Sequence, residues 1–303
     1  MNDIYKKQVA LLIRIMPSVY RIKDFAVHGG TAINLFHKNM PRYSVDIDLT
    51  YIPVKERAES LDAINNHLRT LKSYIEKSIP GIKVIHKHDV WKLQCTLDGA
   101  TVKIEVNGTK RGIIGETEDR KLCERAETEF NMTCKARTVS YSQLYGGKIA
   151  AALSRQHPRD LFDCKYMEMA SFHDVKNGFM LCLLGSDKPV IESLQPNAID
   201  QTEALEKQFE GMSDTPFTYS DYEEARHNLI QQLNDSLTET DREFLLSFEN
   251  GEPDWEKCCA GDLSRYPSVK WKLQNIAKLK KSNPQKHKAG LEKLQTFLFP
   301  KKG

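Results

Sequence analysis

Residues 43–51 have the sequence Tyr-Ser-Val-Asp-Ile-Asp-Leu-Thr-Tyr, in which polar and apolar side chains alternate. A period of two is typical of a β-strand with one buried face, and it places Ile47 and Leu49 on that face. Asp46 and Asp48 then lie side by side on the other face, where two carboxylates repel each other unless a cation lies between them. Mg²⁺ prefers oxygen ligands and keeps room for phosphate oxygens, so the pattern favours a Mg²⁺ site. The alternative is an ordinary surface strand or turn, which often carries such a pair.

A glycine turn precedes this strand. Residues 25–27 predict a short buried strand, and Gly29, Gly30 and Thr31 connect it to a helix expected over residues 32–38. Glycines let the backbone approach a phosphate closely, and free N–H groups at a helix N-terminus favour an anion. The turn matches neither the Walker sequence nor the dinucleotide fingerprint. A plain strand-to-helix turn with Thr31 as the N-cap is the alternative.

A third carboxylate lies in a predicted hairpin. Strands are expected over residues 83–86, 90–97 and 101–106. Asp98 and Gly99 form a typical hairpin turn between the last two. In the last strand Glu105 shares a face with Lys103. If that strand lies beside the one that contains Asp46, Glu105 faces the same metal site; otherwise it is an exposed acid on an edge strand.

Two cations lie on a predicted helix that spans residues 140–153 and continues toward Arg155. Lys148 and Arg155 share a face with small alanines, so this face can approach an anionic group closely. Pro158 suits the first turn of a further helix.

That further helix contains Arg159, Asp160 and Asp163. Arg159 and Asp163 are four residues apart, so a local ion pair is the simplest role for them. Asp160 in the first turn would complement the helix dipole. Each of these roles is an alternative to a place in an active site.

Two more helices and an irregular segment are expected in the N-terminal half. We expect a helix around residues 9–16, ending or kinking at Pro17, and a long polar helix over residues 55–78. Residues 111–133 are charged and irregular, and they predict a loop or a short helix.

Beyond about residue 170 the sequence shows no clear strand pattern. Apolar residues recur at helical spacing within residues 229–233, 244–248, 269–276 and 291–298. We therefore predict an α/β domain over residues 1–175 and a helical-bundle domain over residues 176–303.

The charge of the chain is unevenly distributed. Its 303 residues include 44 basic and 41 acidic side chains, for a formal net charge of +3. Residues 270–303 hold ten lysines and one acid, Glu292, and so carry +9, which leaves −6 for everything before them. Such asymmetry is typical of an end that faces nucleic acid, and a solubilising helix face is the alternative.

The composition indicates the compartment. The apolar runs are far shorter than the roughly 20 residues that cross a membrane, and the N-terminus lacks a signal pattern. Seven cysteines occur without a CxxC pair, so neither a zinc site nor a disulfide framework is predicted. We expect a cytoplasmic monomer without membrane association.

Four motifs in order along the chain resemble the AbiEii/AbiGii toxin family, the nucleotidyltransferase-like toxins of type IV toxin–antitoxin systems, which are related to the MenT toxins. The motifs are Gly29-Gly30-Thr31-Ala32, residues 42–49, Lys103-Ile104-Glu105 and the segment from Lys148 to Asp163. Together they span roughly residues 20–170. Two positions depart from the pattern: Gly-Gly-Thr replaces the common Gly-Ser, and Pro41 replaces a histidine before Arg42.

The resemblance implies an α/β (α+β) nucleotidyltransferase core like that of DNA polymerase β, with a small mixed sheet and flanking helices. A helical C-terminal domain is compatible with it. The residues that it places against the triphosphate are Gly29, Gly30 and Thr31. The carboxylates that it implies for two Mg²⁺ ions are Asp46, Asp48 and Glu105. The later catalytic positions are Lys148, on phosphate, and Asp160 or Asp163.

These parts suffice for nucleotidyl transfer. Two metal ions can activate an attacking hydroxyl and stabilise the pyrophosphate leaving group during in-line attack at the α-phosphate. Lys148, with Arg155 or Arg159, would offset the growing negative charge. Glu105 would take the proton of the hydroxyl, and Ser44 would either bond a phosphate or cap the strand.

We therefore expect a Mg²⁺-dependent enzyme that moves a nucleotide from NTP to an acceptor hydroxyl. For family members the resemblance implies a tRNA 3′ end as acceptor, a block of translation and a cognate antitoxin. The C-terminal lysines would contact tRNA phosphates, and Trp255, Tyr266 and Trp271 would either stack on an unpaired end or belong to helix cores. Two alternatives stay open: transfer to a protein or small-molecule hydroxyl, such as that of an aminoglycoside, and a nucleotide- or RNA-binding module without turnover.

Overall fold

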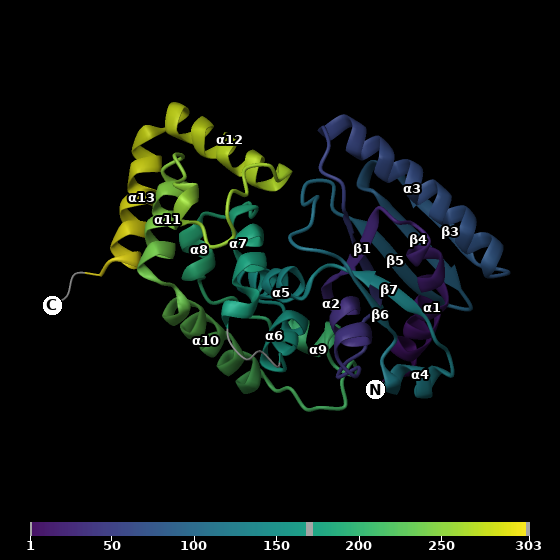
Figure 1. Ribbon diagram of the computed structural model, residues 1–303. Coiled ribbons are helices and arrows are strands. Elements are labelled where there is room, and N and C mark those ends of the chain that lie inside the picture. Colours follow the sequence, from purple (N-terminus) through teal and green to yellow (C-terminus); the bar gives the residue numbers. More distant parts are fainter. Residues whose placement is uncertain (1, 168–171, 301–303) are drawn as a thin grey trace. The chain divides into compact units, whose positions relative to one another are not determined.

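The structure is a computed structural model that describes residues 2–167 and 172–300 (Figure 1). It divides into two compact units, one formed by Met1–Leu144 with Thr202–Thr218 and the other by Tyr145–Gln201 with Tyr219–Gly303. The sequence predicted a single boundary after residue 175. In the observed division, residues 145–175 belong to the helical unit, and Thr202–Thr218 returns to the unit that contains the sheet.

Local packing explains this difference. Gly146 lies in α5 (Tyr141–Arg155), and a Cβ atom there would overlap the backbone nitrogen of Phe179 in α7 (Lys176–Leu184). The glycine therefore lets α5 pack directly on α7. The returning segment is held by the backbone N–H of Tyr43, which donates to the carbonyl of Met212 at 2.7 Å.

The first unit is built on a seven-stranded mixed sheet with the order β3-β4-β5-β2-β1-β7-β6 (Figure 1). Its strands are β1 (Phe25–His28), β2 (Asp46–Tyr51), β3 (Lys83–Lys87), β4 (Lys92–Leu97), β5 (Ala100–Val106), β6 (Glu118–Lys121) and β7 (Lys135–Thr138). Strand β2 runs parallel to β5 and antiparallel to β1, which itself runs parallel to β7. Asp98 and Gly99 turn the β4–β5 hairpin with φ values of +48° and +79°, as predicted.

Two long helices cover the apolar face of this sheet. Helix α1 (Asp3–Tyr20) packs against β5 and β7, α3 (Arg57–Ser78) packs against β3 and β4, and the helices contact each other (Figure 1). Ile47 and Leu49 of β2 are fully buried, whereas Asp46 and Asp48 on the other face are partly exposed. The alternation predicted for β2 is thus confirmed.

Helix α1 does not end at Pro17, which lies inside it. Met16 and Val19 on either side of the proline are buried in the core. Their burial holds the last turn in helical form although Pro17 lacks an N–H group.

The edge formed by β6 and β7 was not predicted. These strands pair antiparallel, and β7 joins β1 where Thr138 lies opposite Val27. Their sequences are Glu-Asp-Arg-Lys and Lys-Ala-Arg-Thr, which are short and charged and show no alternation of apolar residues. These segments are recognised as strands only by their hydrogen-bonded pairing with each other. Helix α4 (Glu124–Phe130) lies between them and is the expected short helix; α9 (Thr202–Gln208) also belongs to this unit.

The second unit consists of packed helices. Besides α5 and α7 it contains α6 (Pro158–Lys165), α8 (Val190–Leu194), α10 (Tyr219–Ser236), α11 (Glu239–Glu249), α12 (Pro267–Ser282) and α13 (Pro284–Leu298). Most of the apolar residues predicted from helical spacing, among them Leu233, Phe244, Val269 and Leu294, are buried, whereas Ile230, Leu273 and Leu291 are half-buried. Across the described residues, no helix is both long enough and apolar enough to span a membrane.

Candidate active site

The two aspartates of β2 lie in a row of polar side chains that crosses the sheet. Asp48 is in register with His28 of β1 on one side and with Glu105 of β5 on the other. Asp46 is in register with Lys103 of β5. Residues paired in register point to the same face of a sheet, so Glu105 shares a face with both aspartates. The strand order thus brings together the three carboxylates predicted from sequence.

The glycine turn packs directly against this row. Gly29 has a φ of +69°, and a Cβ atom there would overlap Oδ2 of Asp48. Only glycine adopts this conformation without strain and also leaves room for the carboxylate. The turn predicted to bind phosphate and a carboxylate predicted to bind metal are therefore in contact.

Gly30 is packed just as tightly from the other side. A Cβ atom there would lie 2.7 Å from Nη2 of Arg42 and 2.9 Å from Oγ of Ser44. Arg42 is almost fully buried, and its Nη1 donates to the carbonyl of Tyr43 at 2.8 Å. A guanidinium charge, which cannot be lost at physiological pH, is thus fixed behind the turn.

Thr31 fastens the turn to β2. Its buried hydroxyl donates to the backbone carbonyl of Asp46 at 2.5 Å and lies 3.0 Å from Oγ of Ser44. Thr31 is the N-cap residue of the helix over Ala32–His37, as the alternative reading of the turn expected, but its side chain makes no capping hydrogen bond to that helix. The helix expected over residues 32–38 is present as a π-helix over Ala32–His37.

Glu105 has a partner on the neighbouring strand. The Nζ atom of Lys92 in β4 lies 2.9 Å from Oε1 of Glu105, and both side chains are partly exposed. The two residues are in register, so Lys92 extends the polar row by one strand beyond Glu105.

The donor set of this row fits a hard cation. Among the residues that the structure describes, no group of three or more His, Cys, Asp or Glu side chains is arranged to hold a metal ion by itself. Mg²⁺ commonly takes only one or two carboxylates and completes its shell with water and substrate phosphates. Asp46 and Asp48 beside a tight glycine turn match that requirement.

The remaining predicted site residues lie in the second unit and form a buried ion cluster. Nζ of Lys148 in α5 lies 3.0 Å from Oδ1 of Asp160 and 2.9 Å from Oδ2 of Asp163, both in α6. All three side chains are at most 6% exposed. Lys148 is thus fixed in position by two carboxylates from the next helix.

A second cation, Arg155, pairs with the cluster from its solvent-exposed side. Nη2 of Arg155, whose side chain is largely exposed, lies 2.8 Å from Oδ2 of Asp160. Burial alone would raise the pKa of Asp160, but the nearby charges of Lys148 and Arg155 outweigh it and lower that pKa to about 2. Arg159 lies in the first turn of α6, where its backbone N–H donates to Nδ1 of His157 at 3.1 Å.

Three residues near the carboxylates were not among the predicted site residues. His28 continues the row of Asp48, Arg42 lies behind the turn, and Lys92 pairs with Glu105. The period of two in β1 offered a signal for His28, since it places His28 opposite the buried Val27. Arg42 and Lys92 depend on strand order and side-chain packing, which local sequence does not encode.

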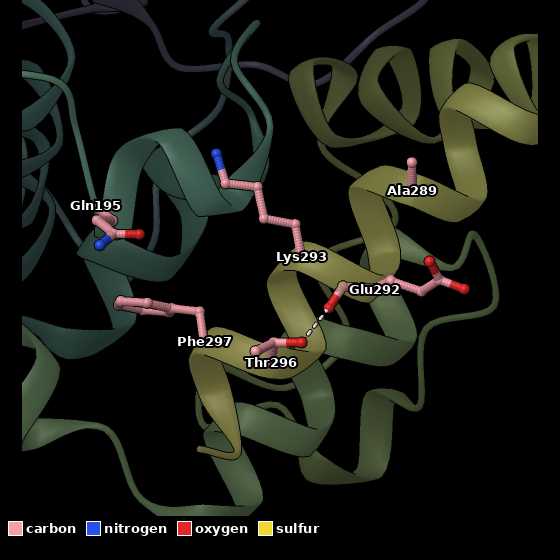
Figure 2. A pocket seen from close by; sticks show the side chains of 6 residues that line it. All are labelled: Gln195, Ala289, Glu292, Lys293, Thr296 and Phe297. Carbon is pink, nitrogen blue, oxygen red and sulfur yellow. Dashed lines mark hydrogen bonds between the residues drawn. The ribbon is translucent and has the colours of Figure 1, made fainter. Parts of the chain in front are cut away.

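The structure also contains an open hollow of about 550 Å³ in the second unit (Figure 2). It lies between Gln195, which follows α8, and Lys293 and Phe297 of α13. None of the residues predicted for the active site lines it.

The match to a family of known proteins identifies the chain as a nucleotidyltransferase. The chain belongs to the AbiEii family, since residues 11–275 match the family described as nucleotidyl transferase AbiEii toxin of type IV toxin–antitoxin systems. Its fold is similar to that of MenT4, a nucleotidyltransferase toxin from Mycobacterium tuberculosis H37Rv, with a TM-score of 0.62 and 12% sequence identity over 90% of this chain and 93% of that one. No curated protein sequence matches the chain.

Proposed function

We propose that this nucleotidyltransferase uses Mg²⁺ to transfer a nucleotide from NTP to a hydroxyl of RNA, the 3′ end of tRNA in particular, and that it acts as a cytoplasmic toxin restrained by a cognate antitoxin. The contact between Gly29 and Asp48 is the observation that carries this proposal. In this contact, a glycine backbone that can bind phosphate touches a carboxylate that can bind the Mg²⁺ ion of an Mg²⁺–NTP complex.

The turn supplies the nucleotide contacts. The backbone N–H groups of Gly29 and Gly30 bind the triphosphate, and Thr31 and Ser44 keep the turn fixed on β2. Arg42 adds a buried positive charge behind the turn. These groups are held in place before substrate arrives, so they need little reorganisation during the reaction.

The polar row supplies the metal ligands. Asp46 and Asp48 would hold Mg²⁺, with Glu105 as the third carboxylate, and the bound ion would supply Lewis-acid stabilisation of the phosphate oxygens. Glu105 also accepts the proton of the attacking hydroxyl, and Lys92 holds the Glu105 carboxylate in the row.

The ion cluster of the second unit contains the remaining residues of the proposal, with Lys148 and Arg155 balanced by Asp160 and Asp163. The family resemblance assigns Lys148 to phosphate binding, with Arg155 and Arg159 as further cations, and within the second unit Asp160 and Asp163 hold the Lys148 ammonium. The side chains of Lys148, Asp160 and Asp163 are almost fully buried. A lysine held by two carboxylates stays where it is placed instead of sampling many rotamers.

The lysine-rich end of the second unit supports RNA as the acceptor. The exposed lysines of α12 and α13 are Lys270, Lys278, Lys280, Lys281, Lys286, Lys288 and Lys293, while Lys301 and Lys302 lie outside the described residues. Among the three aromatics considered for stacking, Tyr266 is buried and Trp255 packs on Phe244, whereas Trp271 is 53% exposed. We assign base stacking to Trp271 alone.

A labelling experiment tests the proposed function. The protein is incubated with Mg²⁺ and each α-³²P-labelled NTP in turn, with total tRNA in one set and cell protein in another. Label on tRNA supports the proposal. Label on protein, or on neither acceptor while NTP still binds, contradicts it.

A further inference from the structure

One face of the sheet carries lysines from three neighbouring strands, of which those of β3 and β5 are exposed. This surface, here called the lysine face, consists of Lys83 and Lys87 of β3, Lys92 of β4 and Lys103 of β5. Lys87 is in register with Lys92, and Lys92 is in register with Glu105. Because side chains alternate along a strand, the lysine face lies on the same side of the sheet as the aspartates of β2.

The lysine face is open to solvent. Lys83, Lys87 and Lys103 are exposed, and Ile85 between the first two is 42% exposed. The opposite face of the same strands is buried under α1 and α3. An antiparallel sheet with one covered face commonly leaves the other in water, so exposure alone assigns no role.

The charge of this face is strongly biased. Within β3, β4 and β5, all of which the structure describes, Glu105 is the only acidic residue, and it is paired with Lys92. Lys83, Lys87 and Lys103 therefore give the face an excess of positive charge. A polyanion complements that excess, and lysine is a point charge that contacts phosphate without selecting a base.

The positively charged lysine face adjoins the proposed active site along one row of residues. Lys87, Lys92, Glu105 and Asp48 occupy successive strands of one row. Neighbouring strands are 4.7–4.9 Å apart, so the row spans about 14 Å from the first lysine to the aspartate. A flexible polyanion that lies along this row has one end at the carboxylates.

We propose that the lysine face binds the phosphate backbone of single-stranded RNA and guides its reactive end toward Glu105 and Asp48. The inference rests on the proposed function, since it takes the carboxylates as the reaction centre. A chain of evenly spaced phosphates can contact the exposed lysines of β3 and of β5 together. Binding is independent of base sequence, because the lysines contact phosphates and not base edges.

Binding to a fluorescein-labelled 15-nucleotide single-stranded RNA of mixed sequence, followed by anisotropy from 50 to 200 mM KCl, tests the proposal. The test variant of the full chain combines Lys83→Gln, Lys87→Gln and Lys103→Gln. We expect its Kd at 50 mM KCl to rise about tenfold, and the slope of log K against log salt to flatten by about 2, because each single-strand phosphate contact contributes about 0.7.

A matched control removes the same charge elsewhere in the first unit. Lys7→Gln, Lys23→Gln and Lys77→Gln alter exposed lysines in or next to α1 and α3, which cover the other side of the sheet. The control should bind RNA as the unmodified chain does. Equal affinity and slope in the test variant and the control would overturn the proposal. A second outcome would also overturn it: the unmodified chain fails to bind RNA but binds a poly-glutamate peptide of the same length, and the three lysine substitutions abolish that peptide binding.

The RNA-binding experiment and the labelling experiment can fail independently, so failure of the lysine-face proposal is distinguishable from failure of the proposed function. If the unmodified chain transfers label to tRNA but the test variant binds RNA normally, the lysine face is wrong and the function stands. If no acceptor is labelled but the test variant loses RNA binding as expected, the proposed function fails and the surface assignment stands.

Discussion

Gly29 and Asp48 are in direct contact: the glycine, at a φ of +69°, leaves no space for a Cβ atom beside Oδ2 of the aspartate. A second hydrogen-bonded link joins the same two segments, from Thr31 to the carbonyl of Asp46. The turn and β2 therefore act as one rigid piece. Displacing either should disturb the other.

Gly29→Ala should abolish nucleotidyl transfer, because it strains the turn and pushes the carboxylate of Asp48 aside. The strain should also lower the free energy of unfolding by about 1–3 kcal/mol. Gly99→Ala is the matched control: Gly99 also has a positive φ, of +79°, but no atom lies within 4 Å of its Cβ position. Transfer assays and urea unfolding should show similar destabilisation in both variants and lost transfer only in Gly29→Ala. Full transfer by Gly29→Ala would refute the contact as a functional feature.

Removing a buried charge from the second unit should be costly. Lys148→Met leaves Asp163 buried without its cation, and breaking such a pair typically costs about 3–5 kcal/mol. Adding Asp163→Asn removes the orphaned charge, so the double variant should be less destabilised than the sum of the two single variants. Urea unfolding of the four proteins measures this coupling. Strict additivity would show that the cluster does not act as a unit.

The low pKa of Asp160 predicts an acid-dependent part of stability. The pKa of this carboxyl is about 2 in the folded chain, against an ordinary value of 3.8. The unfolded chain therefore binds the proton first as pH falls, and the stabilisation is complete above about pH 4 and is lost as the pH approaches 2. Urea midpoints of the unmodified chain and of Asp160→Asn should differ at pH 5 and converge toward pH 2. A constant difference across that range would exclude ionisation of Asp160 as the cause.

The exposure of Trp271 predicts a role in binding and not in folding. Trp271→Ala should leave the urea midpoint nearly unchanged, whereas Trp255→Ala should lower it, because Trp255 packs on Phe244 and Phe248. Loss of one stacking contact should weaken binding of single-stranded RNA by about 1–3 kcal/mol. Anisotropy titration of Trp271→Ala measures this loss. RNA binding equal to that of the unmodified chain would remove Trp271 from the interface.

The sequence was most informative where local pattern determines structure. The alternation around Asp46 predicted β2, and helical spacing predicted α3 and the C-terminal helices. The position of Glu105 depended on strand order, which the parallel pairing of β2 with β5 supplies. The short charged strands β6 and β7 carry no hydrophobic period of their own, so only their pairing reveals them.

The ion cluster shows a second limit of sequence reasoning. Spacing alone suggested that Arg159 pairs with Asp163 along one helix, but Asp163 meets Lys148 of the preceding helix. The observed division of the chain differs from the predicted boundary for a related reason. Gly146 looks like a poor helix residue in sequence, and its role in close packing against Phe179 emerges only in three dimensions.

The most direct test of the central claim is transfer of α-³²P-labelled nucleotide to total tRNA with Mg²⁺, comparing the unmodified chain with Asp46→Asn and Asp48→Ala. Asp89→Asn, which alters an exposed acid of the β3–β4 hairpin, is the control. We expect label on tRNA with the unmodified chain and the control, and none with either variant of β2, although both should unfold at nearly the same urea concentration. Undiminished labelling by Asp48→Ala would contradict the assignment of β2 as the metal-binding strand.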